Sequence, residues 1–178
     1  MTIDNTEQIV TELKAGNRAA FQKLYDNYKQ PFYRAALGIC YNSDDAEDAL
    51  QNCFLKIYRK IHTLKNPRVL ESWMYRILIN CAKSTLKSAH RKWSDLDDLD
   101  TKHEKSKDSQ WTELMLGLQK IPLGYRNVFV LHAIQEIPQQ EVAQILGVTV
   151  GTVKSQFHHA RHRLMEVLTE MGVKYETQ

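Results

Sequence analysis

The sequence has little of what marks an exported, membrane-embedded or disulfide-stabilised protein. Three of its 178 residues are cysteines, Cys40, Cys53 and Cys81, and they lie too far apart in the chain for a metal-binding set. We expect buried, reduced thiols. The N-terminus lacks the basic start and apolar run of a secretory signal, and no apolar stretch approaches the roughly 20 residues that span a bilayer. The sequence therefore predicts a cytoplasmic protein without direct membrane insertion.

The chain also lacks the alternating apolar pattern of β-strands, and its apolar residues recur at helical spacing instead. The pattern predicts an all-α protein with helices over residues 7–15, 18–41, 43–61, 71–89 and 125–135. Asn17 is suited to the N-cap of the second helix, and Pro31 is expected to kink or break that helix. The turn signal Asn66-Pro67 marks a loop over residues 62–69.

A change of composition divides the chain into two small helical domains. Residues 93–109 are rich in Asp, Lys, Ser and Thr and have few apolar side chains. Such a segment cannot bury much surface, so it is predicted to be a flexible acidic and polar linker. It separates an N-terminal domain, residues 1–92, from a C-terminal domain, residues 110–178.

The C-terminal domain contains the pattern of a helix-turn-helix over residues 137–164. Val142, Ile145 and Leu146 give the first helix an apolar face, and Gly147 can end it in the left-handed conformation. Apolar residues are expected on the inner face of the second helix: Val148, Val153, Phe157, Ala160 and Leu164. In this motif the second helix lies in the major groove of DNA.

The outer face of that second helix carries no acid. Its residues are Thr152, Lys154, Ser155, Gln156, His158, His159, Arg161 and His162. Lys and Arg can neutralise phosphates, while Ser, Gln and His can reach phosphates or base edges. The segment is predicted to bind DNA, although an amphipathic helix with a solvated face would share part of the pattern. His158 and His162 are four apart, but without a third ligand we expect neither a metal site nor a cofactor.

An acidic cluster begins the predicted helix over residues 43–61. Its members are Asp44, Asp45, Glu47, Asp48 and Gln51, while Ala46, Leu50, Phe54, Ile57 and Tyr58 form a face suited to a core. The acids could serve the helix dipole or form a docking surface for a basic protein. A catalytic metal site would need further ligands, and these acids have no obvious histidine companion.

A cationic track follows in residues 71–92. Arg76, Lys83 and Lys87 recur near helical spacing beside Trp73 and Tyr75. Aromatic rings beside such a track suit unpaired bases, which stack on the rings while phosphates meet Lys and Arg. Either ring could instead belong to the core.

Three blocks of sequence together resemble the extracytoplasmic-function (ECF) sigma factors of bacterial RNA polymerase. They are DAEDALQNCFLKIY, ESWMYRILINCAK and LGVTVGTVKSQFHHAR, in that order. The resemblance implies a transcription initiation factor with no reaction of its own. It would bind core RNA polymerase at the β′ clamp and β flap, recognise −10 and −35 promoter elements and assist promoter melting. An anti-sigma factor is a further implied partner.

The resemblance also implies three sets of site residues. The core-polymerase set is Asp45, Glu47, Asp48, Gln51 and Phe54. The −10 set is Lys65, Asn66, Arg68, Trp73, Arg76, Asn80, Lys83 and Lys87. The −35 set is Thr152, Lys154, Ser155, His158, His159 and Arg161. Gln156 and His159 stand where the family often has Arg, which should weaken phosphate attraction. The linker acids Asp95, Asp97, Asp98 and Asp100 could mimic phosphates in a polymerase channel or belong to a solvated tether.

Two other functions would fit parts of the pattern. A dimeric helix-turn-helix regulator predicts a ligand pocket, a dimer and a palindromic operator, and it leaves the acidic cluster and the cationic track without a role. A nucleic-acid enzyme using the acids of residues 44–48 with a divalent metal predicts cleavage that Asp45→Ala abolishes.

Overall fold

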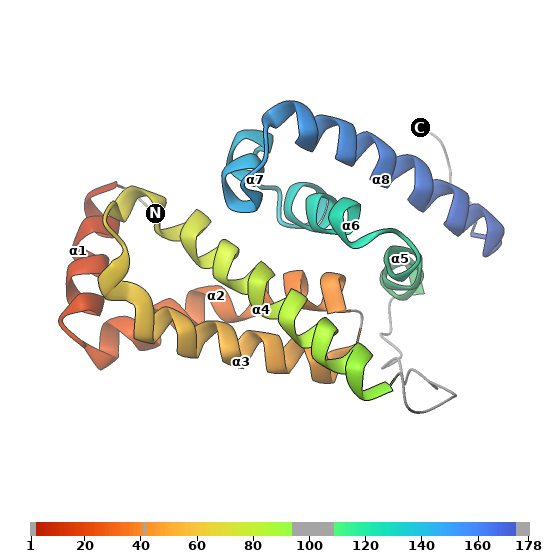
Figure 1. Ribbon diagram of the computed structural model, residues 1–178. Helices are drawn as coiled ribbons and strands as arrows, with labels where there is room; N and C mark the ends of the chain where they lie inside the picture. Colours follow the sequence, from red (N-terminus) through yellow and green to blue (C-terminus); the bar gives the residue numbers. More distant parts are fainter. Residues whose placement is uncertain (1–2, 41, 94–108, 174–178) are drawn as a thin grey trace.

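The protein is built from two groups of helices, as a computed structural model shows for residues 3–40, 42–93 and 109–173 (Figure 1). The N-terminal domain contains α1 (Ile3–Lys14), α2 (Arg18–Cys40), α3 (Ser43–Lys60) and α4 (Leu70–Trp93), with the 3-10 turns η1 (Ile61–Thr63) and η2 (Pro67–Val69). The C-terminal domain contains α5 (Ser109–Gln119), α6 (Leu123–Phe129), the π-helical turn η3 (Val130–Ile134), α7 (Gln139–Leu146) and α8 (Val150–Glu170). The described residues form no strand, so the predicted all-α fold is confirmed.

Local sequence signals place most helix ends. The Asn17 side chain accepts a hydrogen bond from the backbone N–H of Ala19 at 2.9 Å, which confirms it as a cap of α2. The expected break at Pro31 was wrong, because α2 runs through the proline. The next turns of α2 bury Phe32 and Ala35 completely, so packing holds the helix together where proline would otherwise end it. The first helix begins at Ile3 rather than at residue 7, and α4 continues to Trp93 rather than ending at residue 89.

The N-terminal domain is a bundle in which α3 packs against both α2 and α4, while α1 lies across its end beside η1 and η2. Its interior is filled by large apolar side chains. Phe32, Ile39, Ile57, Met74 and Leu78 are fully buried. The three cysteines are buried and free, as predicted from their apolar surroundings.

In the C-terminal domain the long helix α8 packs against α5, α6 and α7. Leu118, Val128, Leu131, Val142 and Val153 are among its buried residues. After α6 the chain widens into η3, where the Gln135 N–H donates to the Val130 carbonyl at 3.0 Å. The wide turn directs the chain into α7, which places the helix-turn-helix against the remainder of the domain.

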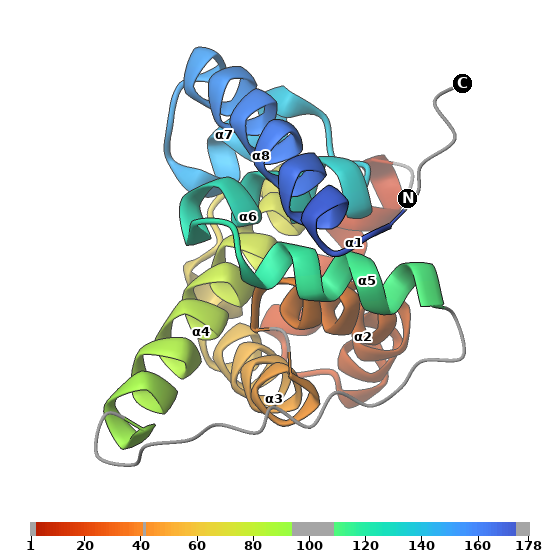
Figure 2. The same cartoon turned by 90° about the vertical axis from the view of Figure 1, so that its right-hand side faces the viewer.

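The two domains pack against each other, although the sequence predicted domains on a tether. Helix α5 crosses over α2, and α7 lies against α4 (Figures 1 and 2). Their buried apolar side chains form one continuous cluster. Small residues on α2 permit the approach: a Cβ added at Gly38 would lie 2.9 Å from the Val130 Cγ2 atom. Nearly all of the predicted linker, including Asp95, Asp97, Asp98 and Asp100, lies outside the described residues.

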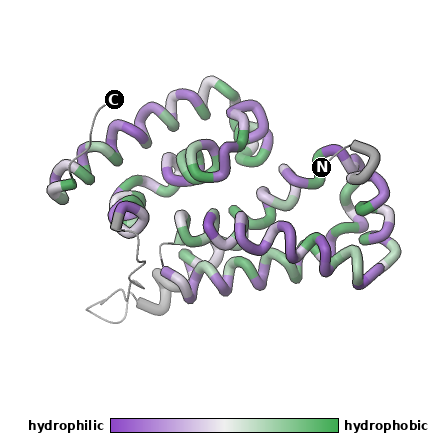
Figure 3. The backbone as a smooth tube through the Cα atoms, turned by 180° about the vertical axis from the view of Figure 1, so that it is seen from behind, coloured by the Kyte–Doolittle hydropathy of each residue, from purple (hydrophilic) through white to green (hydrophobic). Residues whose placement is uncertain are grey.

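Hydrophobic and hydrophilic residues are interspersed along the helices rather than gathered in uniformly apolar segments (Figure 3). Within the described ranges, none of the helices has the length and apolar character that crossing a bilayer requires.

Candidate nucleic-acid and partner-protein interfaces

The first candidate surface is the solvent-facing side of α3. Glu47, Asp48 and Gln51 are exposed there, as the acidic pattern predicts. Leu55 and Tyr58 continue the same side at helical spacing, with 54% and 53% of their surface exposed. We call these five residues the α3 outer face. It combines negative charge with two large hydrophobic side chains, which is typical of a protein-docking surface.

Two residues of the predicted docking set serve the fold instead. The Asp45 backbone N–H donates to the Asn42 side chain at 2.7 Å, and the Asn42 amide donates to the Asp45 carboxylate at 2.7 Å. Asp45 therefore belongs to the N-terminal cap of α3. Phe54 is only 5% exposed and packs against the rings of Tyr25 and Phe32, with centroids 4.8 and 5.8 Å away. Phe54 therefore lies in the core and not on the exposed docking surface to which the sequence assigned it.

Sequence reasoning missed Leu55 and placed Tyr58 in the core. Both errors have one cause, because the C-terminal half of α3 carries apolar side chains on two sides. Beside this face lies a groove of about 350 Å³ between α2 and α3, lined in part by Tyr25, Tyr33 and Gln51. The signal available in the sequence was the helical spacing, because Leu55 follows the polar Gln51 by four positions and so shares its side of the helix.

The second candidate surface begins at the loop between α3 and α4. Buried Leu64 and Leu70 anchor the loop, while Lys65, Asn66 and Arg68 are exposed. The Asn66 side chain accepts a hydrogen bond from the Arg68 N–H at 3.1 Å, and this caps η2. The Arg68 Nε atom lies 3.8 Å from a carboxylate oxygen of Glu7 on α1. Because both groups are exposed, this ion pair contributes little and leaves the cation available to an anionic ligand.

The same surface continues along α4. Arg76, Asn80, Lys83 and Lys87 follow one stripe at spacings of three and four residues, and we call them the α4 track. Asn80 and Lys87 are exposed, and Lys83 is half-buried. Trp73, half-buried, lies one turn before Arg76 on the same stripe. The stripe therefore joins one aromatic ring to three cations.

Two members of this region are engaged with the C-terminal domain. The Arg76 guanidinium donates to the backbone carbonyls of Gln144 and Ile145, in the last turn of α7. Tyr75 is 3% exposed, and its hydroxyl donates to the Gln135 side chain at 3.2 Å. Burial, followed by the nearby Glu71 carboxylate, raises the pKa of Tyr75. Tyr75 is thus a core residue, whereas the side chains of His90, Arg91 and Lys92 lie outside the described part.

The third candidate surface is the helix-turn-helix. Gly147 has φ of 69° and ψ of 37°, the left-handed conformation predicted for it, and the Val148 N–H donates to the Ala143 carbonyl at 3.0 Å. Thr149 caps α8, since its hydroxyl accepts a hydrogen bond from the Thr152 N–H at 3.1 Å. Val153, Ala160 and Leu164 are buried as expected. Val148 was placed on the inner face of α8 wrongly: it lies in the turn and is 37% exposed.

Most of the predicted DNA-binding residues project from α8 into solvent. Lys154, Ser155, His158, His159 and Arg161 are all exposed, and we call them the recognition face. Thr152 is half-buried, and its hydroxyl lies 2.9 Å from that of Thr149, so it contributes to the cap. The ring of Tyr125 on α6 stacks on His159 with centroids 5.7 Å apart and planes 22° apart. No sequence pattern predicts this contact, because it depends on how α6 packs on α8.

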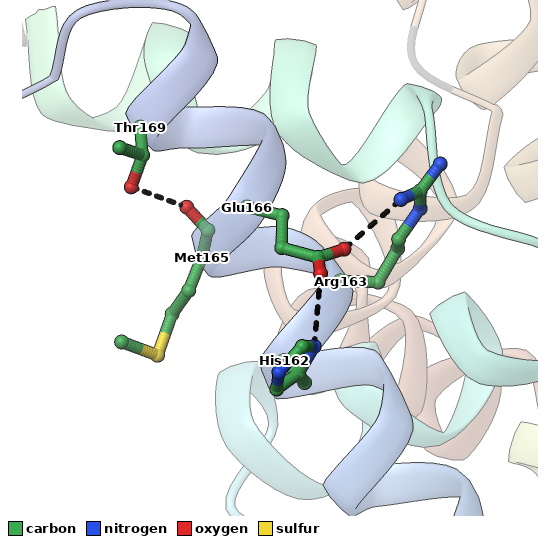
Figure 4. A network of polar contacts seen from close by, with 5 residues as sticks. All are labelled: His162, Arg163, Met165, Glu166 and Thr169. Carbon is green, nitrogen blue, oxygen red and sulfur yellow. Dashed lines mark hydrogen bonds and ion pairs between the residues drawn. The ribbon is translucent and has the colours of Figure 1, made fainter.

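Glu166 marks the C-terminal limit of the acid-free surface (Figure 4). Arg163 donates to one Glu166 carboxylate oxygen at 2.9 Å, and the His162 Nδ1 atom lies 3.3 Å from the other. In the described part of the chain, no three His, Cys, Asp or Glu side chains gather as a metal site would require. The charge available to DNA on α8 is therefore concentrated in the recognition face.

Comparison with known proteins gives two family matches. The model described as sigma-70 region 2 matches residues 24–92, and the one described as sigma-70, region 4 matches residues 112–164. RNA polymerase sigma factor SigV of Bacillus subtilis is 29% identical over 160 residues, which cover 88% of this chain and 96% of SigV. ECF RNA polymerase sigma factor SigW of the same organism is 26% identical over 179 residues, covering 91% of this chain and 96% of SigW.

Solved structures share the fold. The sigma factor RpoE in complex with the anti-sigma factor NepR from Bartonella quintana has a TM-score of 0.71 at 22% identity, over 84% of this chain and 96% of that chain. CnrH in complex with the cytosolic domain of CnrY has a TM-score of 0.70 at 22% identity, over 91% of this chain and 96% of that chain.

Proposed function

Because this chain belongs to the extracytoplasmic-function sigma factors of bacterial RNA polymerase, we propose that its three surfaces divide the work of promoter recognition among them. The protein acts in promoter-specific transcription initiation. The observation that carries the division is that three surfaces of distinct chemistry lie on separate elements: the α3 outer face, the loop and α4 track, and the recognition face of α8. We assign residues 1–92 to the first two, 93–109 to a linker and 110–178 to the third.

The α3 outer face is the docking site for core polymerase. Glu47, Asp48 and Gln51 supply negative charge and hydrogen-bond acceptors for a basic surface such as the β′ clamp. Leu55 and Tyr58 supply apolar area that leaves water on binding. Asp45 supports the site by capping the helix, and Phe54 supports it from the core. The C-terminal domain would bind the β flap of core RNA polymerase.

The loop and the α4 track bind the −10 element. Lys65, Asn66 and Arg68 are exposed at the loop where an unpaired base could be held, and Trp73 lies where the loop joins the track. Extruding a base costs a few kcal/mol, so stacking and phosphate contacts must compensate. The cations of the track would follow the backbone of the melted strand.

The recognition face of α8 binds the −35 element in the major groove. Lys154 and Arg161 can meet phosphates or guanine edges, and Ser155 and His158 can reach either. His159 is held by its stack on Tyr125, which limits the ring orientations that it can present to a base. Thr152 contributes through the cap of α8.

Three further assignments follow from family membership. The protein has no reaction of its own and works by dividing binding energy between DNA and polymerase. It acts in the cytoplasm, where bacterial polymerase and promoters are. It is held inactive by an anti-sigma factor, since the related RpoE of Bartonella quintana is bound by one.

Gel filtration with core RNA polymerase tests the proposal. Wild-type protein should co-elute with the polymerase at one-to-one stoichiometry, and Asp48→Lys should abolish co-elution because it reverses a charge on the α3 outer face. Glu170→Lys is the matched control, since Glu170 is an exposed acid at the far end of α8. Normal co-elution of Asp48→Lys would disprove the docking assignment. Failure of wild-type protein to co-elute, with DNA binding retained, would favour the dimeric regulator.

A further inference from the structure

Two pairs of stacked rings join α6 to α8. Tyr125 stacks on His159 with ring centroids 5.7 Å apart and planes 22° apart. One turn further along α6, Phe129 stacks on Phe157 with centroids 6.0 Å apart and planes 28° apart. Nearly parallel rings at these separations form offset stacks, which aromatic side chains favour. The two contacts are therefore alike in geometry and involve the same two helices.

The two stacks end on different parts of α8. Phe157 is half-buried and packs against the hydrophobic core, where the ring of His132 meets it nearly at right angles with centroids 4.7 Å apart. The Phe129 pair therefore serves the fold. His159 is exposed and belongs to the recognition face, so the Tyr125 stack links the interior of the domain to the surface assigned to the −35 element.

The Tyr125 stack fixes the orientation of the His159 ring. An exposed histidine ordinarily exchanges among several rotamers, whereas Tyr125 is half-buried, packs against the core and holds its partner from one side. The ring of His158 lies beside the same imidazole, with centroids 5.9 Å apart and planes 71° apart. A stack covers a ring face, but the imidazole nitrogens lie on the ring edge and remain available for hydrogen bonds. His159 thus presents its nitrogens in a direction that the fold determines.

A fixed ring orientation matters more for the choice of base than for attraction to phosphates. Attraction to phosphates depends on charge and tolerates many side-chain conformations. A hydrogen bond to a base edge requires a narrow range of distance and angle, and a good base contact discriminates against the wrong base by about fivefold or more. A side chain already held in its binding orientation also loses less conformational entropy when the complex forms. Removing the stack should therefore reduce sequence discrimination and leave non-specific DNA binding nearly unchanged.

We propose that Tyr125 is a specificity determinant of the −35 surface, a positioning residue that holds the His159 ring where it hydrogen-bonds to one base pair in the major groove. This inference rests on the proposed function of the recognition face. Tyr125 acts through His159, from a helix that precedes the helix-turn-helix, and makes no contact with DNA itself. The cations of the recognition face, Lys154 and Arg161, supply an attraction to phosphates that does not depend on the stack.

Nuclear magnetic resonance of the full-length protein tests the stack in solution. The ring current of Tyr125 should shift the His159 ring protons upfield, and His159→Ala identifies those resonances by removing them. Tyr125→Phe should preserve the shift because it keeps the ring, and Tyr125→Leu should abolish it. Tyr125→Met takes the place of Tyr125→Leu if circular dichroism shows that the leucine variant is unfolded. Unchanged His159 resonances in the folded variant without a ring would overturn the stack.

Selection of DNA by the holoenzyme tests the effect on base preference. The full-length protein, combined with core RNA polymerase, selects from a pool of duplexes with a long randomised segment, and the enriched sequences give the preference at each position. His159→Ala should remove the preference at one position of the upstream element. Tyr125→Leu should reduce the same preference about fivefold, and Tyr125→Phe should retain it. Phe129→Leu is the matched control, since it removes the other stack between α6 and α8 and should leave the preference unchanged.

The outcomes of the selection separate this inference from the proposed function. A folded Tyr125→Leu protein that keeps the wild-type preference at that position would overturn the positioning role, and so would an equal loss in Phe129→Leu. If His159→Ala selects the same sequences as wild type, His159 reads no base and the inference fails. If the wild-type holoenzyme enriches a −10 sequence and no upstream element, the −35 assignment of α8 is itself wrong.

Discussion

Replacing Phe54 and Leu55 separately by alanine should separate folding from polymerase binding at two adjacent positions. Phe54 is 5% exposed and Leu55 is 54% exposed, so the same α3 backbone turns one side chain into the core and the other into solvent. The Phe54 ring contacts those of Phe21, Tyr25 and Phe32, with centroids 6.4, 4.8 and 5.8 Å away.

The two substitutions should have very different effects on the free energy of unfolding. Removing a buried phenylalanine ring costs about 3–5 kcal/mol, because transfer energy is lost and a cavity remains. For a protein of this size that corresponds to a fall in Tm of roughly 6–20 °C. Leu55→Ala should change the free energy of unfolding by less than about 0.5 kcal/mol, since most of its side chain is already in water.

Polymerase binding should show the opposite order at a temperature where both variants are folded. Burying the exposed half of Leu55 against a partner is worth about 1 kcal/mol. Leu55→Ala should therefore weaken the Kd for core polymerase roughly fivefold. Phe54→Ala should bind nearly as wild type once it is folded. Urea denaturation monitored by circular dichroism and a polymerase titration give the two quantities.

A stable Phe54→Ala variant that fails to bind polymerase would refute this reasoning. It would mean that Phe54 leaves the core to meet the partner and that the α3 outer face is not the docking site. A Leu55→Ala variant with unchanged Kd would remove Leu55 from that face.

Further consequences concern the helix-turn-helix and the core thiols. Lys154→Ala should weaken binding of a promoter duplex, with a shallower salt dependence than wild type, and unchanged affinity and slope would place Lys154 off the DNA. Gly147→Ala should cost about 1–2 kcal/mol in urea denaturation, because Gly147 has φ of 69° and its Cβ would meet nothing within 4 Å. Gly124→Ala, at an open helical position, should instead stabilise the protein by about 0.5 kcal/mol. If both substitutions changed the free energy of unfolding in the same direction, the backbone argument would be refuted. Burial raises the pKa of Cys40 to about 12 from an ordinary value of 9.0. As pH rises, the unfolded chain therefore loses the Cys40 proton before the folded protein does, so the free energy of unfolding should fall above about pH 9. Cys40 should also resist modification by iodoacetamide at pH 8 until the protein unfolds.

The sequence by itself determined the elements and their chemistry. Helical spacing located the helices, Asn17 and Gly147 carry the local signals of a helix start and a helix stop, and the absence of acids marked the recognition face. These features depend on interactions within a few residues, so they can be read from neighbouring positions. The all-α fold and the family followed from the same local patterns.

Only the tertiary structure decided which way several of these side chains face. Phe54 and Leu55 are adjacent apolar residues, and the rotation of α3 against α2 and α4 chose which is buried. The engagement of Arg76 with α7 and the stack of Tyr125 on His159 join residues far apart in the chain. Helical spacing says which residues share a face but not what packs against it, because that depends on the summed contacts of all the helices together.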